Sequence, residues 1–236
     1  MDAVAARVRV GAKEASAIGR AEMSQEVLQL ASKAESGDAA AQGELAFRYQ
    51  RGLGVGQDEE KALVFWVRSA SRGNARGQRG LGRVYMAGRA GVAQDDKEAV
   101  RLFRLAADQG DHGAQNNLGL MLSHGRGVEK HDDVMAVHYW QLAARQQNPS
   151  ALCSLGLMYA QGRGGLPRNI LQAALSYQRA AELGSVEALF NIAELYHAGD
   201  GVEKDIPEAK RLYQLAFDKG YSEAASRLQH LSESET

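Results

Sequence analysis

The chain has 236 residues, of which 44% are hydrophobic and 24% are charged, and its formal net charge is −1 at pH 7. This composition is typical of a water-soluble globular protein, and the balanced charge gives no general attraction to nucleic acid or to an anionic membrane. No run of about eighteen apolar residues predicts a membrane span, and a single cysteine excludes an internal disulfide framework. We therefore expect a cytoplasmic protein that binds neither nucleic acid nor membrane.

Residues 1–23 form the first segment and lack the continuous apolar stretch of a secretory signal. Their arginines would suit an organelle transit peptide, but Asp2, Glu14 and Glu22 argue against one. We interpret this segment as an N-terminal arm or a degenerate repeat. An organellar or exported protein is the alternative, if a targeting segment was removed. Residues 24–37 predict a capping helix, because QEVLQLASKAES reads as one helix before the first repeated unit.

A period of 36 or 37 residues organises the rest of the chain. Glycines that follow an alanine-rich helix recur at Gly73, Gly110, Gly184 and Gly220, and Gln147 occupies the missing midpoint. The predicted segments are the units 38–73, 74–110, 111–147, 148–184 and 185–220, and then a C-terminal capping helix and polar tail at 221–236. A period in the thirties that is built from two helices predicts an all-α solenoid, here with about five repeats.

Each unit predicts two helices, A and B, that pack as an antiparallel pair. In helix A, a leucine or isoleucine is followed by glycine or alanine, which favours a close helix crossing. In helix B, an alanine and an aromatic residue recur four positions apart on one helix face. The columns are Leu45, Leu81, Leu118, Leu155 and Ile192 in helix A, and Trp66, Phe103, Trp140, Tyr177 and Tyr213 in helix B.

The loops between helices A and B repeat a glycine-rich pattern, as in GRGVEK at 125–130 and GDGVEK at 199–204. A phosphate-binding loop would need G-x-x-x-x-G-K-[ST] after a strand, and no copy has it. We therefore interpret the loops as structural: a glycine ends helix A, and an acidic or amide side chain caps helix B. The expected caps are Asp58, Asp95, Asn169 and Asp205, with Asp132 in the copy where His131 breaks the column.

No residue pattern predicts catalysis or a cofactor. His131, Asp132 and Asp133 are adjacent instead of spaced as ligands on a helix face, so with His138 they would form only a weak metal site. We interpret them as caps and surface residues. Cys153 has no histidine and asparagine partners in a recognisable pattern, and we expect a structural or groove-lining thiol. The sequence predicts no catalytic residue, no metal and no cofactor.

The pattern LG..Y..G.GV..D...A...Y..AA..G is clearest in LGRVYMAGRAGVAQDDKEAVRLFRLAADQG (81–110) and LYHAGDGVEKDIPEAKRLYQLAFDKG (195–220). Over residues 38–220 the chain resembles the Sel-one-like repeat (SLR) family, which is related to the tetratricopeptide repeats. The resemblance implies a right-handed superhelix and a non-catalytic scaffold or adaptor for another protein, within a signalling or multiprotein complex. A regulatory or substrate-recruiting repeat domain of a larger enzyme is the alternative.

The resemblance also implies a binding face, because helix A lines the concave groove in tetratricopeptide-like stacks. The partner-binding candidates on that face are Arg76, Arg79, Arg83, Met86, Asn116, Leu120, Leu157, Phe190, Glu194 and His197. The arginines share one helix face, and later units present apolar residues. Such a groove fits a peptide or helix with an acidic end and a hydrophobic end. A solvated arginine run, and apolar residues that only complete the core, are the alternatives.

Overall fold

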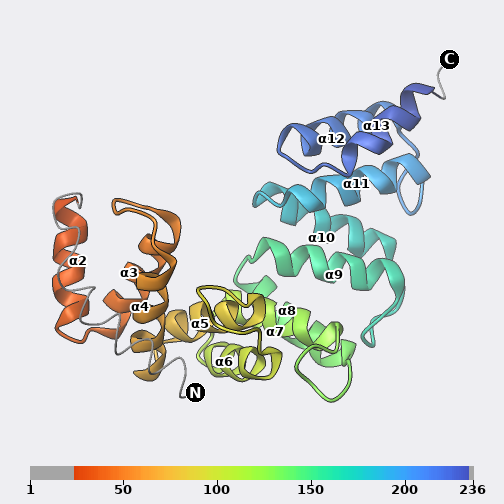
Figure 1. Cartoon of the computed structure of the whole chain (residues 1–236). Coiled ribbons are helices and arrows are strands. Elements are labelled where there is room, and N and C mark those ends of the chain that lie inside the picture. The colour runs from red at the N-terminus through yellow and green to blue at the C-terminus, as the bar shows by residue number, and fades with distance from the viewer. Residues whose placement is uncertain (1–23, 234–236) are drawn as a thin grey trace. The chain divides into compact units, whose positions relative to one another are not determined.

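The computed structural model describes residues 24–233, so the predicted arm at 1–23 and the last three residues of the tail lie outside the described residues. Within this range the chain forms twelve α-helices and no strand (Figure 1), which confirms the all-α repeat fold. The helices are α2 (Gln25–Glu35), α3 (Ala39–Arg51), α4 (Glu59–Ser71), α5 (Ala75–Ala87), α6 (Asp96–Asp108), α7 (His112–Ser123), α8 (Asp133–Arg145), α9 (Pro149–Gln161), α10 (Ile170–Glu182), α11 (Val186–Ala198), α12 (Ile206–Asp218) and α13 (Ala224–Glu233). None of them combines the length and apolar character needed to cross a bilayer.

The described chain divides into two compact units, and α7 carries the division. The first unit comprises residues 24–121 and 125–131, and the second comprises 122–124 and 132–233. In the first unit, α2 contacts α3, and the pairs α3/α4 and α5/α6 are joined through α4 and α5. In the second unit, each helix from α8 to α13 contacts the next one along the chain (Figure 1). Contacts of this kind are typical of repeats that lean on their neighbours.

The aromatic column of helix B lies in the core, as predicted. Its five side chains are at most 3% exposed: Trp66, Phe103, Trp140, Tyr177 and Tyr213. The small residues of helix A lie against these rings. A Cβ atom added at Gly82 would come within 2.7 Å of Phe103, and one added at Gly156 would come within 2.5 Å of Tyr177. The close helix crossing predicted from these two glycines is therefore confirmed.

Helix B begins at a capping side chain in all five repeats. Each cap accepts a hydrogen bond of 2.8–3.0 Å from the backbone N–H three residues further on. The caps are Asp58, Asp95, Asp132, Asn169 and Asp205. Asp132 thus replaces His131 as predicted, and the loops serve to end one helix and begin the next.

The break in the glycine column at Gln147 leaves the backbone unchanged. Gln147 has a φ of 59°, and Gly110 and Gly184 at the equivalent positions have φ values of 88° and 93°. This left-handed region disfavours a residue with a Cβ by roughly 1–2 kcal/mol. The turn is therefore imposed by the packing of the helices on either side, even where glycine is missing.

Candidate protein-binding surface

The three predicted arginines lie on α5, and two of them already have partners within the first unit. Arg76 pairs with Glu44 at 2.5 Å, and its guanidinium lies 4.9 Å from the centre of the Phe47 ring. Arg79 pairs with Asp111 at 2.9 Å. These ion pairs join neighbouring repeats. Two of the arginines therefore act first as contacts within the fold.

Arg83 differs from the other two, because it is exposed and makes no ion pair within residues 24–233. The pKa of its guanidinium is lowered from the ordinary value, first by partial desolvation and then by the positive charges of Arg79, Arg51 and Arg89. A positive charge surrounded by like charges favours the approach of an anion. Arg83 is thus the arginine of the stripe that is available to a partner.

A pocket of about 140 Å³ lies beside Arg83, between α3, α4 and α5. Its walls combine apolar groups with a few charged ones: Gln50, Glu59, Ala62, Trp66, Arg83, Val84, Met86, Ala87, Arg89 and Ala90. The indole N–H of Trp66 is buried and finds no hydrogen-bond partner among residues 24–233. The predicted residues Arg83 and Met86 are therefore brought together at one concave site.

The predicted residues of the middle repeats expose apolar surface. Leu120 on α7 is 38% exposed and Leu157 on α9 is 41% exposed, which is more than a side chain that completes a core would be. Asn116 is half-buried on α7. Both leucines thus offer apolar contact area on helices A.

The predicted residues of the last repeat contact α12, α13 and the segment between them. Phe190 packs against the rings of Tyr213 and Tyr221, with ring centres 5.4 and 5.0 Å apart. Glu194 accepts a hydrogen bond from the hydroxyl of Tyr213 and forms an ion pair of 2.8 Å with Arg227. His197 Nδ1 lies 3.4 Å from the same hydroxyl. In this structure the three residues belong to the packing around Tyr213.

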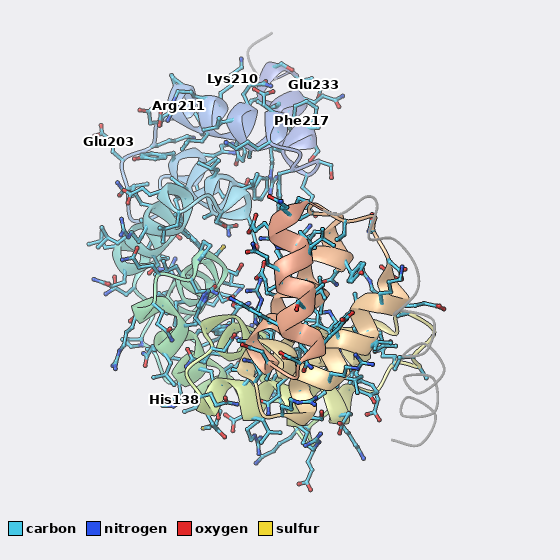
Figure 2. All side chains as sticks on the ribbon, turned by 90° about the vertical axis from the view of Figure 1, so that its left-hand side faces the viewer. His138, Glu203, Lys210, Arg211, Phe217 and Glu233 are labelled. Carbon is cyan, nitrogen blue, oxygen red and sulfur yellow. The ribbon has the colours of Figure 1, made fainter. Side chains whose placement is uncertain are left out.

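Helices B expose more apolar side chains than the sequence reasoning anticipated. The exposed large apolar residues on helices B are Leu105, Val134, Met135, Leu171, Leu175 and Phe217. Figure 2 shows Phe217 on α12, where its side chain is 44% exposed. The sequence contained a signal for the exposure of Leu171 and Leu175. Leu171 lies two positions before the buried Ala173, and Leu175 lies two positions before the buried Tyr177. Because a helix turns by about 200° over two residues, both leucines face away from the buried side.

The residues considered for a metal site have structural roles. Asp132 caps α8, and Asp133 pairs with Arg163 at 2.9 Å. His138 is exposed on α8 (Figure 2), edge-on to the ring of Tyr139. Between residues 24 and 233, no group of three or more histidine, cysteine, aspartate or glutamate side chains is placed to hold a metal ion.

Cys153 is buried on α9, where Asn191 Nδ2 donates a weak hydrogen bond of 3.4 Å to its sulfur. Burial is the main cause that raises the pKa of its thiol to about 12. A thiol becomes a nucleophile only as the thiolate. Cys153 is therefore a structural residue of the core at neutral pH.

Comparison with solved structures shows the same fold in several bacterial proteins. A Sel1 repeat protein from Oxalobacter formigenes is 30% identical, with a TM-score of 0.72 over 81% of this chain and 75% of that one. A protective antigen of uropathogenic Escherichia coli with an SLR fold is 31% identical, with a TM-score of 0.64 over 89% of this chain. The alignment covers 52% of the antigen, so the chain spans about half of its length. An immunity protein from Pseudomonas aeruginosa, 21% identical, shares the fold with a TM-score of 0.55 over 92% of this chain and 81% of that one.

A search among curated proteins found no match. A scan against protein-family models matched the Sel1 repeat five times in succession. The matched regions are residues 39–74, 75–111, 112–148, 149–185 and 186–221. Together they cover more than half of the chain, which therefore belongs to the Sel1 repeat family.

Proposed function

We propose that the chain is a non-catalytic scaffold or adaptor that binds a peptide or helix of another protein along its helices A, within a signalling or multiprotein complex of the cytoplasm. Sel1 repeat proteins generally serve as scaffolds for protein interactions. The observation that carries the proposal is Arg83, which has no carboxylate partner in the described chain and borders an apolar pocket. A site of this kind offers both a charge and an apolar contact to a peptide.

The chemistry of the described residues supports binding without turnover. At the start of α8, Asp132 caps the helix and Asp133 pairs with Arg163. Cys153 stays protonated at neutral pH because its thiol is buried. A nucleophile needs a neighbouring base within hydrogen-bond reach or a lowered pKa, and Cys153 has the opposite shift.

Peptide selection on the purified full chain tests the proposal. A random peptide library is displayed on phage, the selected peptides are synthesised, and hydrogen exchange of the chain is compared with and without them. We expect slower exchange in helices A, above all in α5. Slower exchange confined to α6, α8 and α10 would move the binding surface to the exposed leucines of helices B. If no peptide is selected, the scaffold proposal is wrong.

A further inference from the structure

A recurring ion pair ties each of two loops to the repeat before it. In both loops an arginine directly follows the glycine after helix A. This arginine forms an ion pair with the aspartate that begins the preceding helix B. In the first unit Arg126 Nη2 lies 2.7 Å from Asp96, and in the second unit Arg163 Nη2 lies 2.9 Å from Asp133. The pKa of the Asp96 carboxyl is lowered chiefly by its hydrogen bond with Arg126. In each pair the partners are thirty residues apart.

An arginine and an acidic residue also occupy the equivalent positions of an earlier loop, but there they form no ion pair within the described part of the chain. Arg89 follows Gly88 at the end of α5, and Glu59 begins α4 thirty residues earlier. Within residues 24–233 neither side chain forms an ion pair, and both line the pocket beside Arg83. The pocket therefore lies where the two later junctions hold a closed arginine–aspartate pair.

Ala90 gives a physical reason for the difference. It follows the arginine in the left-handed region, at φ 52°, where Gly127 and Gly164 stand in the other two loops. A Cβ atom on Gly127 would overlap the backbone carbonyl of Asp96, and one on Gly164 would overlap Val137. A residue with a Cβ at this position, such as Ala90, is therefore incompatible with the close approach that the later loops make to α6 and α8.

The open junction collects positive charge around apolar walls. Arg83 and Arg89 both line the pocket, and Arg51 is near enough to lower the pKa of Arg83. Glu59 is one carboxylate against these guanidinium groups. The pocket thus has fewer negative groups than positive ones, which favours an anionic ligand.

We propose that this pocket anchors an acidic side chain within an apolar stretch of the partner peptide, with its carboxylate between Arg83 and Arg89. The inference rests on the proposed function, since it specifies the peptide that the scaffold takes. Arginine forks bind carboxylates through paired hydrogen bonds, and Val84 and Met86 offer apolar contact to the neighbouring residues of the peptide. A volume of about 140 Å³ is room for one side chain, so the pocket is an anchor point on a longer surface.

The anchor is tested with two synthetic pools of twelve-residue peptides made of alanine, leucine, valine and serine. One pool carries glutamate at a fixed central position and the other carries glutamine. The chain has two tryptophans, so in a Trp140→Phe variant the fluorescence of Trp66 alone reports binding at the pocket. The affinities of the two pools are also measured on the unmodified chain, by the fluorescence anisotropy of fluorescein-labelled peptides. We expect the glutamate pool to bind about tenfold more tightly than the glutamine pool.

Two sets of variants decide the outcome. Arg83→Gln with Arg89→Gln should abolish the preference for glutamate, whereas Arg104→Gln with Arg145→Gln removes the same charge from exposed sites elsewhere and should keep it. Equal binding of both pools, or a preference that survives in the Arg83 and Arg89 variant, would overturn the anchor and leave peptide binding intact. Failure to bind either pool would contradict both the anchor and the scaffold.

Ala90→Gly offers a separate test that leaves every charge in place. The change should let the loop approach α4 and the Arg89–Glu59 pair form, as Arg126 and Asp96 do. We expect a higher midpoint of urea unfolding together with a loss of about tenfold in affinity for the glutamate pool. A more stable variant that binds this pool as tightly as the parent would overturn the proposal.

Discussion

A Cβ atom added to Gly82 would lie 2.7 Å from Cε1 of Phe103. Phe103 is fully buried on α6, and Gly82 is the small residue of α5 that makes room for it. The contact explains why a residue with low helix propensity stands inside this helix, since its cost of about 0.5–1 kcal/mol is offset by close packing.

Gly82→Ala should therefore destabilise the protein although alanine favours helix. Overpacking of a core typically costs about 1–3 kcal/mol, which exceeds the gain in helix propensity. Urea unfolding followed by circular dichroism measures the difference. Gly56→Ala serves as the control, because a Cβ added there would have no described atom within 4 Å beyond Gly56 itself and its chain neighbours. A Gly82 variant as stable as the parent would contradict the close crossing of α5 and α6.

Trp140→Ala should lower the free energy of unfolding by about 3–5 kcal/mol, because it removes a large side chain that is 2% exposed. Since repeats stabilise their neighbours, the loss should extend to the adjacent helix pairs and populate partly unfolded forms. Hydrogen exchange would show faster exchange in α8, α9 and α10. Val134→Ala on the same helix removes a side chain that is 62% exposed and should leave stability nearly unchanged.

Gln147→Gly should stabilise the protein by roughly 0.5–1 kcal/mol, because glycine adopts the left-handed backbone without the steric cost that glutamine bears. The exposed hydrogen bond of 3.4 Å to Arg179 that the change removes is weak. The thermal midpoint checks the sign. Gln146→Gly is the matched control, since Gln146 has a φ of −94° and glycine there brings no relief. A decrease in stability at position 147 would show that its backbone is not strained.

Cys153 should react slowly with iodoacetamide in the native protein at pH 8 and rapidly in urea, because its pKa is about 12 and the thiol is buried. Its folded pKa is raised above the ordinary thiol value. The stability from the protonated thiol is thus fully present below about pH 8.5 and is lost as pH rises toward 12. Urea titrations between pH 7 and 11 measure the decline, and Cys153→Ala should show a smaller one. Equal declines in the two proteins would contradict the shift.

The sequence alone determined the repeat period, the helix pairs and the residue columns of helices A and B that face the core. These features depend on local rules, because burial repeats with the 3.6-residue turn and a cap acts within three residues of itself. Asp132 was identified as the cap of α8 for this reason, although His131 breaks the column. The aromatic residues of helix B were placed correctly because every repeat buries the same helix face.

Only the tertiary structure decided which predicted site residues are available to a partner. The arginines of α5 look alike in the sequence, but Arg76 pairs with Glu44 on α3 and Arg79 pairs with Asp111, which directly precedes α7. Arg83 stays exposed. Glu194 was likewise assigned to the groove, and Arg227 from α13 binds it. Ala90 differs from its glycine equivalents by one methyl group, and its effect depends on how closely a loop approaches another helix. Such outcomes depend on distances between residues thirty or more positions apart, which a linear pattern does not specify.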